Sequence, residues 1–252
     1  MTGVSRLYWP WLLPGLLLTG CAECGRAPAP KATAPLPQTQ SVDLRTALFT
    51  VFPEFRGAEI TNGRAWVERT MRWTKASGAP VEALFAPHAM KKGFSKADGG
   101  PGFVRPPFEL DVEAAGPETY RLEVGLPLGQ SDVGRLLQSP SPMTSEELAH
   151  WLPLPPGAEV LEETFFLELT YLGKTLARTD YLVRQVVGLL LASHWSAVSM
   201  PPGWPLDGGE GSVPAEWELR LEKSYGGTKV ELKKKEAWVT LRFLQPLTVK
   251  SL

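Results

Sequence analysis

Two short runs of alternating apolar and charged residues, at 108–113 and 120–126, constrain the fold more than any other feature of this sequence. Residues 115–117 separate the runs and have the composition of a turn. Because successive side chains of a strand point to opposite faces, the pattern predicts an antiparallel hairpin with one covered face and one wet face. We expect four apolar side chains on the covered face: Phe108, Leu110, Tyr120 and Leu122.

The same alternation predicts further strands. They are residues 58–73, folded as a hairpin about Asn62 and Gly63, then 159–172, 217–222 and 229–243. Asn-Gly is the pair that a type I′ turn favours, because both central residues need a positive φ. Within 229–243 the apolar positions shift from even to odd numbers, which predicts a bulge or break near residues 233–235.

Helices are predicted where apolar residues recur every three or four positions. The predicted helices are residues 42–52, residues 81–92 with a break or kink at Pro87, and a short helix capped by Thr144 or Ser145 that runs to Trp151. Residues 181–195 are apolar on nearly all sides. We favour a helix there, because fifteen residues is long for a strand, and a central strand is the alternative.

The body of the protein, residues 42–252, is therefore expected to be a single α+β domain. Its centre would be an antiparallel, β-hairpin-rich sheet with a few packing helices. Two stretches rich in glycine and proline, 93–107 and 199–214, are expected to be loops. No internal repeat is apparent in the sequence.

The N-terminus has the pattern of an export signal. Arg6 precedes an apolar run at residues 7–19 that contains two prolines. A membrane-spanning helix needs ~20 apolar residues, so this run fits a cleavable signal better than a permanent span. The run ends in the sequence Leu18, Thr19, Gly20 and Cys21, which resembles the lipobox of bacterial lipoproteins.

This resemblance implies that residues 1–20 are a signal peptide cleaved after Gly20, and that Cys21 carries a diacylglyceryl thioether. It implies export and attachment to a membrane through the lipid. Ala22 in place of Asp points to the outer membrane if the source is Gram-negative. Residues 21–41 would then be a tether rich in proline and alanine. Cys24 would have no intramolecular partner. It could pair between molecules or be acylated itself, and we favour a free thiol without consequence.

Composition and motifs exclude several classes of function. The formal net charge of −1 gives no long-range field that would attract nucleic acid. With 24 Gly and 24 Pro, the chain is unsuited to a coiled coil. It contains no Gly-x-Ser-x-Gly elbow, no Ser-x-x-Lys pair, no His-Glu-x-x-His and no phosphate-binding loop. We therefore expect no cofactor and no metal site.

The three histidines are the remaining candidates for chemistry, and none has a second histidine at metal-ligand spacing. His88 follows a proline beside a loop and is the best candidate for a catalytic residue. His150 and His194 fit ordinary positions on a helix surface and at a helix end.

Tryptophans are the candidates for contact residues. Trp66 and Trp73 are seven positions apart, so they should face opposite sides of a regular strand. Trp204 lies in the loop 199–214 without a periodic partner, which makes it the best candidate for a contact with another molecule.

The sequence thus favours a lipid-anchored, non-catalytic protein of the cell envelope that binds a partner protein or supports an envelope assembly. One alternative is an envelope hydrolase that uses His88 together with a carboxylate. Another is an exported toxin or effector delivered as a lipoprotein.

Overall fold

The strands in which apolar side chains alternate with polar ones form a large sheet, which makes up most of the body. The computed structural model describes residues 41–51, 59–74, 79–141, 143–173, 176–200, 216–223 and 227–247. The strands are β1 (Glu59–Arg72), β2 (Ser95–Lys96), β3 (Phe103–Arg105), β4 (Phe108–Gly116), β5 (Thr119–Pro127), β6 (Glu159–Leu172), β7 (Trp195–Ser199), β8 (Glu216–Lys223), β9 (Lys229–Lys235) and β10 (Trp238–Pro246). The helices are α1 (Leu44–Val51), α2 (Val81–Lys91), α3 (Gln130–Gln138), α4 (Ser145–Ala149) and α5 (Leu176–Ala192).

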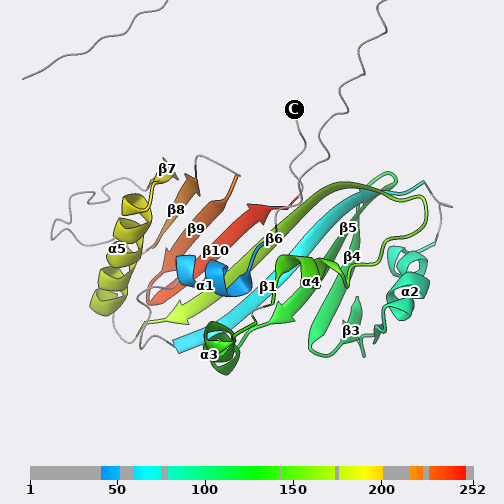
Figure 1. Ribbon diagram of the computed structural model, residues 1–252, viewed down its shortest axis with the longest axis horizontal. Helices are drawn as coiled ribbons and strands as arrows, with labels where there is room; N and C mark the ends of the chain where they lie inside the picture. Colours follow the sequence, from blue (N-terminus) through cyan, green and yellow to red (C-terminus); the bar gives the residue numbers. More distant parts are fainter. Residues whose placement is uncertain are drawn as a thin grey trace, which may run out of the picture. The chain divides into compact units, whose positions relative to one another are not determined.

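In the described part of the chain, all ten strands join one antiparallel sheet. Their order is β2-β3-β4-β5-β1-β6-β10-β9-β8-β7 (Figure 1). The two longest strands, β1 and β6, pair with each other in the middle of the sheet. The predicted α+β class, with an antiparallel sheet and a few packing helices, is confirmed.

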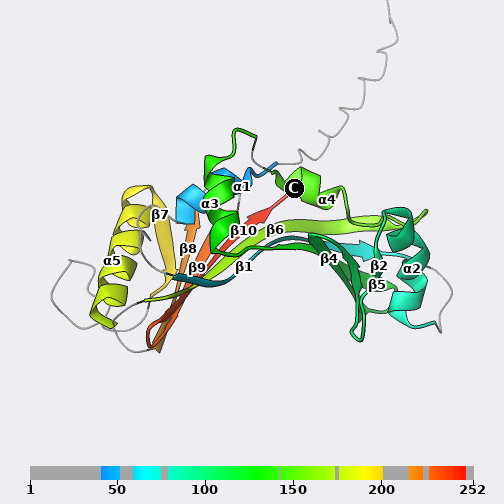
Figure 2. The same ribbon diagram turned by 90° about the horizontal axis from the view of Figure 1, so that it is seen from below.

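One face of this sheet is covered by helices and carries the core. Figure 2 shows α1, α3 and α4 over the middle of the face, with α2 and α5 at its two ends. Alternate side chains of the long strands are fully buried there, including Val67, Leu122, Leu167 and Leu241. The other face, called the open face below, has no described helix over it. The sheet arches so that the open face lies on its concave side (Figure 2).

The topology contains an internal duplication. A long strand is followed by a helix and then by four strands that return, one beside the next, to pair with the long strand. The first half does this with β1, α2 and β2 to β5, and the second half with β6, α5 and β7 to β10. The two halves meet along β1 and β6, which places an approximate two-fold axis between these strands.

Backbone geometry supports the duplication in detail. The Leu128 N–H donates to the Gly63 carbonyl at 2.8 Å, and the Leu247 N–H donates to the Glu163 carbonyl at the same distance. Residues 122–128 and 241–247, which end in these two leucines, share the pattern Leu-x-Val/Phe-x-x-Pro-Leu. The repeat is not apparent from the sequence alone, because seven loosely matched residues carry little signal without the topology.

The hairpin predicted about Asn62 and Gly63 is wrong. Residues 59–72 form a single strand, with a shift in its register against β6 between Ile60 and Asn62. Gly63 is required there by close packing rather than by a turn. A Cβ at this position would lie 2.6 Å from the Leu128 carbonyl oxygen and would clash with the Leu169 side chain. Asn62 and Gly63 therefore lie at a bulge, where another part of the backbone comes close. Glycine is common at such sites as well as in turns.

Of the bulge or break predicted near residues 233–235, the structure has a break, because a tight turn follows Lys235. Lys235 pairs directly with Trp238, so that Glu236 and Ala237 connect two separate strands, β9 and β10. Glu236 has φ 53°. Apolar and polar residues alternate regularly within each strand. The change from even to odd apolar positions therefore arises from the turn, and neither strand contains an extra residue. The turn lacks glycine, and this concealed it in the sequence.

Other predicted elements are confirmed or adjusted. Residues 108–116 and 119–127 pair as the expected hairpin, with Leu110 and Leu122 buried. The preference for a helix within 181–195 is confirmed by α5, although Trp195 already begins β7. Pro87 lies inside α2 without ending it. The expected loop at 93–107 contains two short strands, β2 and β3, and helix α3 was not foreseen.

The short helix α4 begins as predicted. Thr144 accepts a hydrogen bond from the Glu147 N–H at 3.2 Å, and the Glu147 carboxylate accepts one from the Thr144 N–H at 2.8 Å. This reciprocal pair is a capping box, which satisfies two donors that the first turn of a helix leaves free. The helix ends at Ala149, two residues before the expected end at Trp151.

Candidate functional site

Several residues singled out in the sequence lie outside the described residues. Cys21, Cys24, Trp204 and the tether up to residue 40 are among them. The lipid anchor and the contact role of Trp204 therefore stay predictions.

His88, the candidate catalytic residue, lies on α2. Its ring meets the edge of Trp73 at a centroid distance of 5.6 Å. Trp73 in turn contacts Phe85 and Tyr120, so His88 borders an aromatic cluster between α2 and the covered face of the sheet. His150, rather than His88, lines a cavity of about 520 Å³ on the helix side, together with Phe108, Trp151 and the capping-box residues of α4.

The centre of the open face carries an aromatic stack. The rings of Trp66 on β1 and Phe166 on β6 lie 4.9 Å apart and within 9° of parallel. The guanidinium carbons of Arg64 and Arg242 lie 5.7 and 5.9 Å from the Trp66 ring centre, one from each half of the sheet. Trp73 is buried against the helices instead, which confirms that the two tryptophans face opposite sides. This stack lies at the approximate two-fold axis.

Beside the stack, the first half of the open face is rich in carboxylates. We define the acidic patch as five residues on β1, β4 and β5: Glu68, Glu109, Asp111, Glu113 and Glu123. Two guanidinium groups contact four of these carboxylates. Arg64 pairs with Glu123 and, at 3.3 Å, with Asp111. Arg121 pairs with Glu113 at 2.7 Å and with Glu68 at 3.2 Å.

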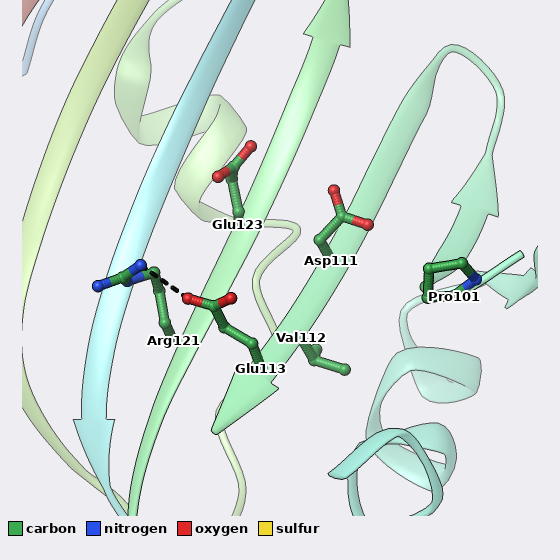
Figure 3. A pocket seen from close by; sticks show the side chains of 7 residues that line it. Pro101, Asp111, Val112, Glu113, Arg121 and Glu123 are labelled. Atoms are coloured by element: carbon green, nitrogen blue, oxygen red, sulfur yellow. Dashed lines mark hydrogen bonds and ion pairs between the residues drawn. The ribbon is translucent and has the colours of Figure 1, made fainter. Parts of the chain in front are cut away.

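The acidic patch borders a cavity of about 390 Å³. Seven residues line it: Pro101, Gly102, Asp111, Val112, Glu113, Arg121 and Glu123. Figure 3 shows the carboxylate side chains of Asp111, Glu113 and Glu123 together with Pro101. Gly102 has φ +91°, and a Cβ there would lie 2.7 Å from an Asp111 carboxylate oxygen. Glycine thus keeps the space beside Asp111 open.

Burial and crowding raise the pKa of two members of the patch. Loss of solvent is the largest cause for both Glu68 and Glu123. Arg121 opposes the rise at Glu68 and Arg64 opposes it at Glu123, while neighbouring carboxylates add to it. A carboxyl group with a raised pKa is one whose charged form the surroundings disfavour. The two arginines therefore only partly compensate the carboxylates of the patch.

The strands β8, β9 and β10 of the second half carry nearly balanced charge on the open face. They have five cations, Arg220, Lys229, Lys233, Lys235 and Arg242, and four carboxylates, Glu216, Glu218, Glu222 and Glu231. These residues pair across neighbouring strands. Lys229 contacts Glu222 at 2.8 Å, and Arg242 donates to Glu168 at 2.7 Å.

Reasoning from the sequence did not identify this face as a site. The alternating acidic residues of 108–113 were interpreted only as the wet side of a hairpin. The sequence did contain one signal for this face: the hairpin of β4 and β5 carries four carboxylates and few cations at the alternating positions that share one side. The pairing of β1 with β6, which brings Trp66 onto Phe166, depends on residues 100 positions apart and left no local signal.

Comparisons with protein-family models, with curated proteins and with solved structures find no match to this chain. Among the described residues, no cluster of His, Cys, Asp or Glu is arranged to hold a metal ion. No helix in the described ranges is both long and apolar enough to cross a membrane.

Proposed function

We propose that this chain is a lipid-anchored lipoprotein of the bacterial cell envelope that binds a partner protein on the open face of its sheet. It acts by binding rather than by catalysis, with its lipid on Cys21 and its tether holding the body away from the membrane. The outer membrane is the proposed location if the source is Gram-negative. This proposal combines the N-terminal lipobox pattern with the geometry of the body.

The single observation that carries the binding role is the aromatic stack of Trp66 and Phe166 at the centre of the open face. Helices bury the apolar side chains of the opposite face, yet here two large rings lie only half-buried between arginines. Aromatic residues and arginine are the types most enriched where binding energy concentrates in protein interfaces. A concave sheet face with such a centre fits a protein surface better than a small substrate.

Photo-crosslinking in the native host tests the binding role. A photoreactive amino acid would replace Thr240, on the open face, or Glu146, which is exposed on α4 on the helix side. We expect a crosslinked protein from position 240 and none from position 146, and we expect Trp66→Ala to abolish the adduct. Absence of an adduct at position 240, or equal yields at both positions, would contradict the proposed site.

The lipid anchor has its own test. Cys21→Ser should remove labelled palmitate and leave an uncleaved, slower-migrating precursor, because the thioether forms on this sulfur. Two acyl chains hold a protein durably in a membrane, since each buried methylene contributes ~0.8 kcal/mol. Cys24→Ser is the matched control and should leave both labelling and cleavage unchanged. A Cys21→Ser protein that is still labelled and processed would exclude the lipoprotein assignment.

A further inference from the structure

The two halves of the open face can be compared position by position. In the first half, Glu68 pairs across strands with Glu123, which pairs with Asp111. The corresponding ladder in the second half runs from Glu168 to Arg242 and then to Glu231. Glu123 and Arg242 therefore occupy equivalent positions on β5 and β10.

The same register identifies two further positions where a carboxylate of the first half corresponds to a cation of the second. Glu113 on β4 corresponds to Lys233 on β9, and Glu109 corresponds to Lys229. Three of the five carboxylates in the acidic patch thus have a cation at the equivalent place in the other half. The backbone accommodates a fully paired surface at these positions, so the excess of carboxylates is not imposed by the fold.

The excess is also not arranged for a metal ion. The carboxylates of the patch come from three strands, and four of them already contact Arg64 or Arg121. Three oxygen donors do not converge at one point within the described residues. Carboxylates spread along a sheet face, beside a cavity kept open by Gly102 and next to an aromatic centre, suit several separate cationic groups.

We infer that the partner presents an arginine- or lysine-rich segment, which docks its cationic side chains on the acidic patch while an apolar side chain contacts the stack of Trp66 and Phe166. This inference rests on the proposed function, because it names the chemistry of the same partner. Guanidinium groups form paired hydrogen bonds with carboxylates, so arginine suits the acidic patch. Complementary charge of this kind gives specificity and a fast, salt-dependent association.

The first experiment uses the purified full-length chain in detergent with a fluorescent hexa-arginine peptide as the probe. The acidic-patch variant combines Asp111→Asn, Glu113→Gln and Glu123→Gln. A matched control removes the same charge from the second half through Glu218→Gln, Glu222→Gln and Glu231→Gln. We expect the first variant to bind the peptide about tenfold more weakly or worse, because charge-assisted contacts are lost. The control should change binding less than about twofold. Equal losses in the two variants would overturn the inference.

The second experiment repeats crosslinking from position 240 in the native host with both variants. The inference expects the adduct to disappear in the acidic-patch variant and to persist in the control. If the adduct persists undiminished in both, the cationic docking is wrong while the proposed function stands. If even the unaltered chain gives no adduct, the proposed function fails. An adduct identified as a second copy of this chain would also overturn the inference of a separate basic partner.

Folding of the acidic-patch variant is checked by its thermal melting. We expect it to melt no lower than the unaltered chain, because it loses like charges that repel one another. The single variant Glu123→Gln provides a second, milder test, with Glu218→Gln on the open face of the second half as its matched control.

Discussion

The two halves of this protein share a topology, but they differ in the side chains that equivalent positions carry on the open face. Towards the helices, equivalent positions carry apolar residues in both halves: Leu110 and Val230, Val112 and Leu232, Leu122 and Leu241. On the open face, three pairs of equivalent positions carry opposite charges, as with Glu123 and Arg242. The comparison shows which constraints come from folding. Burial fixes the residue type on one face, whereas the other face is free to be specialised.

The helices differ as well. α2 has 11 residues and buries Phe85 and Ala89, whereas α5 has 17 residues and packs through three valines and Leu190. Lys234 on β9 is buried and pairs with Asp180 of α5 at 2.7 Å, and the equivalent residue of the first half is Ala114. A buried ion pair requires exact partners, because an unpaired buried charge is costly. The second half thus fixes its helix by charge as well as by packing.

The largest effect is expected from breaking the core in the two halves at equivalent places. Leu122→Ala and Leu241→Ala each remove a fully buried side chain, so each should lower the free energy of unfolding by about 3 kcal/mol. Because the halves share one continuous sheet, we expect a single urea transition for both variants, followed by circular dichroism. Two separate transitions, or a loss in only one variant, would show that the halves are not energetically equivalent.

A smaller effect is expected at the helix ends. Gly93 follows α2 with φ +84°, and His194 follows α5 with φ +64°, each just before a buried aromatic residue. A left-handed conformation favours glycine. Gly93→Ala should therefore destabilise the protein by about 1 kcal/mol, and His194→Gly should stabilise it by about 0.5 kcal/mol.

Thermal melting of these two variants measures both effects under one set of conditions. The added Cβ at position 93 would lie 3.2 Å from Arg105 Nε, the end of a flexible side chain, so the backbone conformation dominates the cost. Shifts of the same sign in the two variants would contradict the equivalence of these helix ends.

The smallest effect concerns the charge of Glu123 and its dependence on pH. The pKa of this carboxyl is raised above its ordinary value of 4.5, chiefly by burial. The folded protein therefore binds this proton more tightly than the unfolded chain, and this group lowers stability as the pH rises from 4.5 through the raised pKa. Glu123→Gln should remove that loss, so its gain in stability should be present at pH 7 and absent near pH 4.

Urea unfolding at the two pH values measures this difference, with Arg242→Gln as the equivalent variant. Arg242 pairs with the Glu168 carboxylate, so its variant should lower stability at pH 7, opposite in sign to the gain expected for Glu123→Gln. An equal gain for Glu123→Gln at both pH values would exclude the proposed desolvation of its carboxylate.

Local patterns in the sequence predicted much of the fold. The hairpin of β4 and β5, the capping box of α4 and the helix within 181–195 each depend on residues close together in the chain. The failures arose where one local signal serves two structures. Gly63 permits a turn or a close backbone approach, and only the contact with Leu128 decides between them. The turn at Glu236 has no glycine to mark it, and β2 and β3 are too short for periodicity.

The candidate site was much less predictable than the fold. Its centre requires β1 to lie beside β6, and its charge imbalance becomes visible only when each position is compared with its equivalent in the other half. His88, Cys21 and Trp204 were chosen because their own residue types suggest a role. Trp66 and the acidic patch owe their proposed role to neighbours on adjacent strands, and a local sequence pattern does not specify these neighbours.

The seam between β1 and β6 has a consequence for the order of folding. The strands from β2 to β5 can assemble with β1 from a continuous stretch of chain that ends at Pro127, and contacts between such near neighbours form early. β1 then has one edge occupied by β5 and a second edge, 14 residues long, that has no partner until Glu159–Leu172 arrives. A long unpaired edge invites pairing with other chains. The interval between completion of the first half and arrival of β6 is thus the period when a newly made chain is most exposed to aggregation.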